Sequence, residues 1–315
     1  MTPVEITAPA RSGTASWLPA FVALGAIWGS SFLFIKVGIT ELHPVYVTLG
    51  RVLAGALTLV IVLVATRDRL PRDPRLWLHL SVIAAAVNAV PFTLFGYGEQ
   101  HISSILAGIW NGTTPLVTLL VVMAFLPEER PDRARVIGLL VGFVGVLTVL
   151  GVWRGEALTG KPGELLGQLL CFGAALCYGF GFPYLRRVMH GRPESGASIA
   201  AAQLIVATAQ LAIVAPILAG PPPAPTSLSA EVLGSVLALG ALGTGIAFVL
   251  SYRVIRIAGA TTASTVTYVI PVFAALIGVL VLHESLTWYQ PLGALVVLLG
   301  VAISQRAFTR ARPPT

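Results

Sequence analysis

Residues 197–219 read ASIAAAQLIVATAQLAIVAPILA, a run of 23 residues without a charged side chain. A helix of this length, rising about 1.5 Å per residue, crosses a hydrocarbon layer of roughly 30 Å. The run is continuously apolar rather than alternating, and a helix satisfies its own backbone hydrogen bonds in lipid, so it predicts a helix and not a barrel strand. The main solvent of this segment is therefore expected to be lipid.

Similar runs fill most of the 315-residue chain, which is 56% hydrophobic and only 10% charged. A soluble domain is roughly half apolar and a quarter charged. The predicted spans are residues 17–38, 45–65, 76–98, 103–126, 134–152, 164–187, 197–219, 231–254, 260–282 and 288–305. The fold class predicted is an all-α integral membrane protein with ten transmembrane helices.

The basic residues predict the topology. With a cytoplasmic N-terminus, 16 of the 20 Lys and Arg residues fall in inside segments, whereas the outside segments hold only Arg154 and Lys161. This asymmetry follows the positive-inside rule and predicts that both termini are cytoplasmic. Because the basic residues are scattered through short connections, nucleic acid is not an expected partner. The expected partners are the lipid bilayer and a small-molecule substrate, and the oligomeric state stays open.

Matching landmarks divide the chain into two halves. Trp28-Gly29 corresponds to Tyr178-Gly179 at an offset of 150. The pairs at an offset of 156 are Phe92 with Phe248, Pro115 with Pro271, and Glu128 with Glu284. Because each half would contain five spans, an odd number, the second half enters the membrane inverted. Inverted repeats are typical of secondary transporters, whose two halves exchange conformations around a midplane site.

The repeats predict the organisation of the whole chain. We expect a cytoplasmic tail over 1–16, a first repeat over 17–152, an external linker over 153–163, a second repeat over 164–306 and a cytoplasmic tail over 307–315. Only one basic residue precedes the first full-length span, so no cleaved signal peptide is expected.

Residues 26–32, AIWGSSF, together with Lys36, resemble the opening of EamA-type members of the drug/metabolite transporter superfamily. In the second half, the resembling positions are GTGIAF at 243–248, then Tyr252, Ala263-Ser264, Tyr268, Pro271 and Glu284. The resemblance implies a ten-helix exporter or facilitator of small metabolites such as amino acids, located in a bacterial inner membrane. It also implies a central cavity lined mainly by helices 1, 3, 4, 6, 8 and 9.

Polar and aromatic side chains near the middle of the spans are candidates to line that cavity. A polar group in lipid is costly unless it is bonded, so each either forms an inter-helix hydrogen bond or contacts substrate, and aromatic groups either pack or line the cavity. The candidates are Trp28, Ser31, Phe32, Asn88, Phe92, Asn111, Thr114, Tyr178, Phe182, Thr244, Phe248, Tyr252 and Tyr268.

Two prolines and two basic residues stand out inside the spans. Pro115 and Pro271 predict kinks that could act as hinges in the two halves. Lys36 and Arg51 either turn outward and anchor their helices at the interface, or attract anions at the outer mouth.

The acidic residues nearest the spans lie at span ends, and the sequence shows no buried proton relay. They are Glu99, Glu128, Glu164, Glu231 and Glu284. Facilitated diffusion or export down a gradient is therefore favoured over proton exchange, with a histidine or an end-of-helix glutamate as the alternative. Glu128 and Glu284 are expected to be helix caps.

No catalytic motif or metal-binding spacing is present, so neither an enzyme nor a cofactor or metal is expected. Cys171 and Cys177 lie in one span and suggest neither a disulfide nor a metal site. The function predicted is export of a small metabolite, an amino acid or related compound, by alternating access. The alternatives are an anionic sugar-phosphate or nucleotide-type carrier, and a membrane sensor or subunit that transports nothing.

Overall fold

The computed structural model describes residues 17–125, 133–150, 163–258, 263 and 266–310. Within these residues the regular elements are all helices. The predictions for the tail 1–16, for Glu128 and for nearly all of the linker 153–163 lie outside the described residues.

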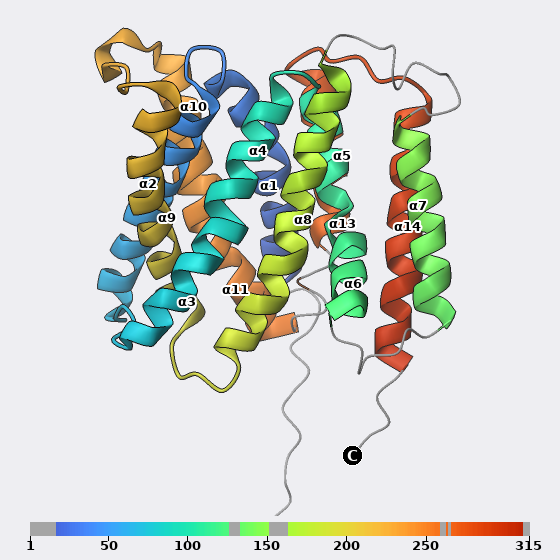
Figure 1. Cartoon of the computed structure of the whole chain (residues 1–315), viewed down its shortest axis with the longest axis horizontal. Coiled ribbons are helices and arrows are strands. Elements are labelled where there is room, and N and C mark those ends of the chain that lie inside the picture. Colours follow the sequence, from blue (N-terminus) through green and yellow to red (C-terminus); the bar gives the residue numbers. More distant parts are fainter. Residues whose placement is uncertain (1–16, 126–132, 151–162, 259–262, 264–265, 311–315) are drawn as a thin grey trace, which may run out of the picture.

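The helices of the first half are shown in Figure 1. They are α1 (Leu18–Gly38), α2 (Pro44–Thr66), α3 (Pro74–Ala84), π-helix η2 (Ala85–Ala89), α4 (Val90–Glu99), α5 (Ser104–Gly112), α6 (Thr114–Phe125) and α7 (Arg133–Leu150). The helices of the second half are α8 (Glu164–Met189), α9 (Gly196–Ala219), the short 3₁₀ helix η4 (Pro225–Ser227), α10 (Ala230–Gly240), π-helix η5 (Ala241–Ile246), α11 (Ala247–Ala258), α13 (Val266–Leu280) and α14 (Tyr289–Arg310).

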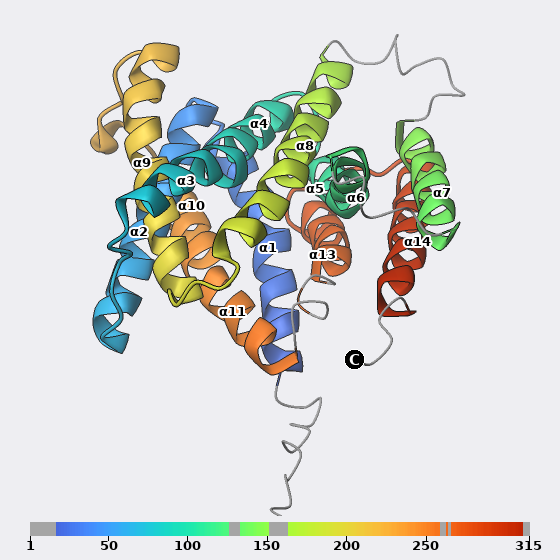
Figure 2. The ribbon, with the colours of Figure 1, turned by 60° about the horizontal axis from the view of Figure 1, so that its bottom comes forward.

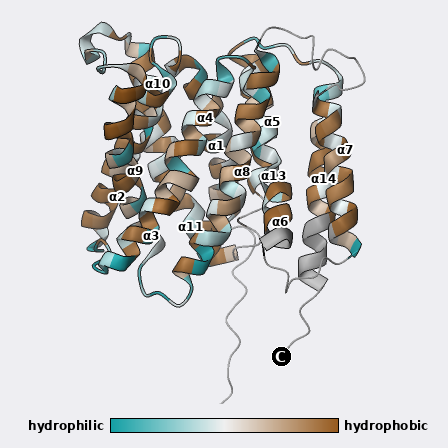
Figure 3. Ribbon diagram, viewed as in Figure 1, coloured by the Kyte–Doolittle hydropathy of each residue, from teal (hydrophilic) through white to brown (hydrophobic). Residues whose placement is uncertain are grey.

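Among the described residues, seven helical stretches are long and apolar enough to cross a membrane, and three further apolar helices are shorter. The shorter ones are Val136–Val149, Val269–Leu280 and Tyr289–Ile303. Hydrophobic residues lie along the helices, whereas hydrophilic ones gather near their ends and connections (Figure 3). Large apolar side chains such as Val64 and Ile217, 74% and 76% exposed, point outward as they do in lipid-facing helices.

The helix boundaries have local causes. Asp73, Ser103, Ser195 and Ser229 each precede a helix, and their side chains accept a hydrogen bond from a backbone N–H in its first turn. Such caps satisfy donors that a helix start otherwise leaves without partners. α14 continues to Arg310, so the first residues of the expected tail 307–315 are helical.

Two helix pairs stand at opposite ends of the molecule: α2 beside α9, and α7 beside α14 (Figures 1 and 2). Glycines allow the second pair to approach closely. A Cβ atom at Gly300 would lie 2.4 Å from the backbone N of Gly142, and one at Gly145 would lie 2.5 Å from the backbone N of Val297. Close packing at small residues is the common way for membrane helices to associate.

Two long helices contain one π-helical turn each. η2 separates α3 from α4 and ends three residues before Phe92, whereas η5 separates α10 from α11 and ends two residues before Phe248. These turns were not predicted from the sequence. π-helical turns are often found at functional sites, because the wider turn disrupts the regular hydrogen-bond ladder.

Candidate functional site

Arg51 of α2 contacts residues in or near both π-helical turns. Its Nε donates a hydrogen bond to Oγ1 of Thr244 in η5 at 3.0 Å, and its guanidinium carbon lies 3.6 Å from the ring centroid of Phe92. The ring face is electron-rich and attracts a cation. Arg51 is only 7% exposed. Outward anchoring at the interface is therefore the wrong interpretation for this side chain, because its charge finds partners inside the helix bundle.

Aromatic side chains form a chain from α1 to α8 through the same region. Phe32 contacts Phe95 edge to face with centroids 5.6 Å apart, Phe95 lies 6.3 Å from Tyr178, and Tyr178 stacks on Phe182 at 5.2 Å. The first three rings are buried, whereas Phe182 is 43% exposed and lies at the edge. Phe95 was not among the predicted site residues, although its i, i+3 spacing from Phe92 indicates that both share a helix face.

Several buried polar atoms lack a hydrogen-bond partner among the described residues. Both amide atoms of Asn88, both carboxyl oxygens of Glu99, Oγ1 of Thr114 and Nε2 of Gln203 belong to this group. Asn88 and Glu99 are 0% exposed. Because the great majority of buried polar groups are bonded, such atoms are candidates to bind a ligand or water. Gln203 and Glu99 were not among the predicted site residues.

Lys36 also points inward rather than to the interface. Its ammonium donates to the backbone oxygens of Glu99 and Ile102 at 2.5 and 2.9 Å. These carbonyls lie at the end of α4, where a cation complements the helix dipole. The outward-anchoring interpretation is therefore wrong for Lys36 as well.

Glu284, in the connection before α14, caps a helix of the other half. Its carboxylate accepts hydrogen bonds from the backbone N and Oγ of Ser104 at 2.8 and 2.9 Å, and from the backbone N of Ile105 at 3.1 Å. A carboxylate at a helix N-terminus is stabilised by these free donors and by the helix dipole. The predicted capping role of Glu284 is confirmed.

The remaining predicted site residues differ in how deeply they are buried. Ser31 is buried and donates to the backbone oxygen of Ile27 at 3.2 Å, whereas Trp28, Asn111, Phe248 and Tyr252 are half-buried. Tyr268 belongs to α13, but its side chain lies outside the described residues. Ser31, Asn88, Thr114, Tyr178 and Thr244 are at most 8% exposed, so this part of the candidate site is buried.

The two prolines lie near one helix break. α5 ends at Gly112 and α6 begins at Thr114, so Pro115 stands in the first turn of a new helix, where a missing N–H costs nothing. Pro271 lies inside α13, and a Cβ atom at Gly112 would be 3.0 Å from its Cγ. The hinge role itself stays a proposal.

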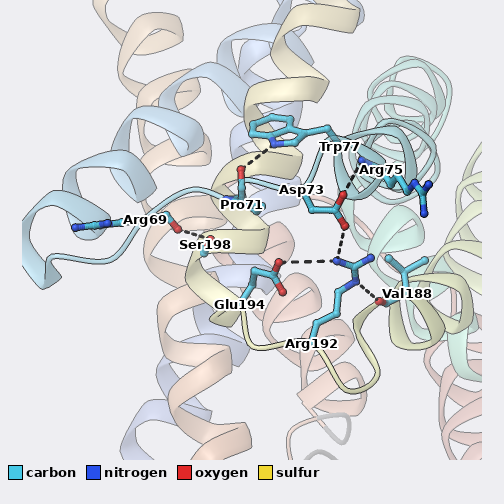
Figure 4. A network of polar contacts seen from close by, with 9 residues as sticks. All are labelled: Arg69, Pro71, Asp73, Arg75, Trp77, Val188, Arg192, Glu194 and Ser198. Carbon is cyan, nitrogen blue, oxygen red and sulfur yellow. Dashed lines mark hydrogen bonds and ion pairs between the residues drawn. The ribbon is translucent and has the colours of Figure 1, made fainter.

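At the end of the molecule where α3 begins, the connections of the two halves are tied together (Figure 4). Arg192 donates to Oδ2 of Asp73 at 3.0 Å and lies 3.9 Å from Glu194. Ser198 Oγ donates to the backbone oxygen of Arg69 at 2.6 Å. The hydrogen bonds from the Arg192 side chain and then from the backbone N–H of Arg75 lower the pKa of Asp73.

A recess of about 390 Å³ opens beside this network. Its lining consists of His79, Tyr184, Arg187, Val188 and Arg192. His79 and Tyr184 are joined by a hydrogen bond of 2.7 Å. None of the predicted site residues lines this recess.

The described residues contain no cluster of His, Cys, Asp and Glu that could hold a metal ion. Cys171 and Cys177 are both free, and Cys171 is buried in the helix packing.

Taken together, the apolar helices and the buried charged and polar groups between them define a polytopic helical membrane protein. The model of the EamA-like transporter family matches this chain twice, over residues 15–151 and 165–305, and the chain belongs to that family. Family membership makes it a membrane transporter by class, without assigning a substrate.

Individual relatives agree with this class. The uncharacterized transporter YoaV of Bacillus subtilis is 25% identical over 291 residues, which cover 92% of this chain and 97% of YoaV. The uncharacterized inner membrane transporter YedA of Escherichia coli K12 is 28% identical over 290 residues, covering 91% and 90%. A solved structure titled only as a crystal structure of a protein has a TM-score of 0.65 at 22% identity, covering 96% of this chain and all of the other, which supports the fold alone.

Proposed function

We propose that this protein is a secondary transporter that exports an amino acid or a related small metabolite across a bacterial inner membrane by alternating access through a central cavity. The family match and the names of YoaV and YedA support a transporter, and the printed location of YedA supports the inner membrane. The excess of basic residues in the inside segments supports cytoplasmic termini.

The proposal includes ten transmembrane helices in two inverted five-helix repeats. The seven long and three shorter apolar helices support the count. The inversion is supported by paired features at one offset: the caps Asp73 and Ser229 are 156 positions apart, as are Phe92 and Phe248, and a π-helical turn precedes each phenylalanine. Such repeats can rock around a site at their interface.

The observation that carries the proposal is the buried guanidinium of Arg51, which contacts Phe92 of its own half and Thr244 of the other. Among the described residues, Thr244 is the hydrogen-bond acceptor of this side chain, and it binds only Nε. The terminal nitrogens keep donors in a planar fork that suits a carboxylate. A ligand bound there would touch both halves, as alternating access requires.

Neighbouring groups suit the rest of an amino acid. Asn88 lies one helical turn before Phe92 on the same face, and its amide offers a donor and an acceptor without partners. The ring chain through Phe95 and Tyr178 offers an apolar surface for a side chain. A mostly apolar site with a few convergent polar groups is typical for small molecules.

The same guanidinium would also suit a phosphate, which is why an anionic carrier is the second candidate. Transport of a mixed panel by proteoliposomes separates the two. We would measure uptake of radiolabelled amino acids, purines and sugar phosphates by wild type, Arg51→Lys, Asn88→Ala and Trp28→Ala. Thr208→Val is the matched control, because the Thr208 hydroxyl only donates to Leu204 within α9.

We expect saturable amino-acid uptake by the wild type and by Thr208→Val, with a reduction of about tenfold or more in Arg51→Lys and Asn88→Ala. One ordinary hydrogen bond to a charged group is worth about that factor. Flux of sugar phosphates alone would replace the proposal by the anionic carrier. No flux of any compound in correctly folded protein would favour the sensor or subunit.

A further inference from the structure

Glu99, the last residue of α4, is a fully buried carboxyl group without a hydrogen-bond partner. Its side chain is 0% exposed, and neither Oε1 nor Oε2 is bonded among the described residues. Glu284 nearby shows the contrast, because its carboxylate accepts three hydrogen bonds. The Glu284 carboxylate is hydrogen-bonded as a helix cap, whereas the Glu99 carboxyl group makes no hydrogen bond among the described residues.

Charges from several elements surround Glu99. Lys36 of α1, Arg51 of α2 and Glu284 lie within electrostatic range. Lys36 donates to two carbonyl oxygens instead of the carboxylate, and Arg51 donates to Thr244. The other titratable groups that face this region are Cys171 and Tyr178 of α8 and His101 of the turn after α4.

This arrangement offers groups for both charges of a zwitterion. Arg51 offers free donors for a carboxylate, and the two open oxygens of Glu99 offer acceptors for an ammonium group. A buried charge needs hydrogen bonds as well as neighbouring counter-charges. The Glu99 carboxyl group has neighbouring counter-charges but makes no hydrogen bond among the described residues. An ammonium group would donate hydrogen bonds to the Glu99 carboxylate, and a proton would neutralise it. Ionisable groups buried in membrane proteins commonly serve ion or proton movement.

We propose that Glu99 alternately binds the ammonium group of a zwitterionic substrate, whose carboxylate is bound by Arg51, and a proton. The proton occupies Glu99 when the site is empty and leaves when the substrate ammonium arrives. One proton then moves inward for each substrate that moves outward, and charge is balanced at Glu99 in both states. This inference rests on the proposed transport function and differs from the expectation, drawn from the sequence, that proton exchange is the less favoured mode.

The test uses proteoliposomes containing wild type, Glu99→Gln, Glu99→Asp or Glu231→Gln. Glu231 is an exposed carboxyl group in the first turn of α10 and serves as the control. Three probes are compared: the amino acid with the highest wild-type flux in the panel above, the α-hydroxy acid that lacks its ammonium, and the amine that lacks its carboxylate. Uptake is measured with and without an inside-acid pH gradient, with the membrane potential clamped.

In wild type and Glu231→Gln, the inside-acid gradient is expected to accelerate amino-acid uptake several-fold, because exiting protons exchange for entering substrate. In Glu99→Gln the gradient should have no effect, and KM for the amino acid should rise about tenfold or more. Uptake of the α-hydroxy acid should be retained. Glu99→Asp should keep the gradient response. A purely structural role of Glu99 would lower transport of all probes equally and leave the gradient response intact.

The inference is overturned if Glu99→Gln keeps both the wild-type KM and the gradient response. It is also overturned if wild type transports the amino acid but ignores the gradient. Absence of any wild-type amino-acid flux would instead remove the proposed function itself, so the two failures are distinguishable.

Discussion

Asp73 and Ser229, 156 positions apart, are the N-cap residues of α3 and α10, and each is bound by a residue from a connection in the opposite half. Arg192, between α8 and α9, donates to the carboxylate of Asp73 at 3.0 Å. Glu41, between α1 and α2, accepts from the backbone N of Ser229 at 2.9 Å. One of these contacts lies where α3 begins and the other where α10 begins, so the connections of the two halves are bonded to each other at both ends of the helices.

The contact between Arg192 and Asp73 should depend on pH in one direction. Because its pKa is lowered in the folded protein, the ionised Asp73 contributes stability above the ordinary aspartate range near pH 4, and this contribution is lost as the pH falls through the lowered pKa. The difference in Tm between wild type and Asp73→Asn, measured in detergent, should therefore be constant near neutral pH and vanish in strong acid. The effect should be small, because the two side chains are 27% and 38% exposed.

The control for this contact is Arg192→Gln, which removes the guanidinium that binds Asp73. Its Tm difference from wild type should also shrink in strong acid, where Asp73 is protonated. If the Tm difference of Asp73→Asn does not change with pH, the contact does not contribute to stability in solution.

Removing the hydroxyl of Thr244 should destabilise the protein. Thr244→Val deprives Arg51 Nε of its acceptor and leaves a buried charge less satisfied, which costs about 1–3 kcal/mol. Thr244→Ser, which keeps the hydroxyl, should recover most of this loss. The free energy of unfolding in detergent is the measurement. Equal losses for Thr244→Val and Thr208→Val would contradict the contact, because Thr208 bonds only within its own helix.

The close approach of α7 and α14 should not tolerate a side chain at Gly300. The Cβ atom of Gly300→Ala would meet backbone atoms of Gly142 at 2.4 Å, so the helices must separate. Overpacking of this kind costs about 1–3 kcal/mol. Gly234→Ala is the matched control, because a Cβ atom there meets nothing within 4 Å. Thermal unfolding that is equally unaffected by both changes would show that α7 and α14 do not pack this closely.

Loss of the Glu284 carboxylate should loosen the start of α5. Glu284→Ala removes the acceptor for the backbone N–H groups of Ser104 and Ile105, whereas Glu284→Gln keeps one acceptor oxygen. A lost cap costs about 1 kcal/mol, so these amides should exchange with deuterium about five- to tenfold faster in Glu284→Ala. Amides at the start of α9, capped by Ser195, provide the internal reference. Equal exchange in the variant and wild type would mean that Glu284 does not cap α5.

Helix positions were predictable because each depends on local composition. The run 197–219 appears as α9 (Gly196–Ala219), and the run 45–65 as α2 (Pro44–Thr66). The largest shift among the described residues concerns the predicted span 288–305, where α14 continues to Arg310. The π-helical turns were not predictable, because the segments AAVNA and ALGTGI have the same apolar composition as the regular helix around them.

The candidate site was only partly predictable. Phe92 and Thr244 were named from their helix faces, and the structure brings both to Arg51. Glu99 was placed correctly at a span end, but the sequence could not show that its side chain is buried. A position along a helix is a local property, whereas the direction in which an end residue points depends on the neighbouring helices.

The amino-acid sequence by itself determined that this chain forms helices in a lipid membrane. A long apolar segment has few alternatives in lipid, because its backbone groups must form their hydrogen bonds within the segment. Only the tertiary structure decided which charges turn inward. Arg51, Lys36 and Glu99 could each have reached water from a single helix. Arg51 and Glu99 are buried and Lys36 is half-buried, because Thr244, the end of α4 and the surrounding helices supply partners or enclosure that lie far away in sequence.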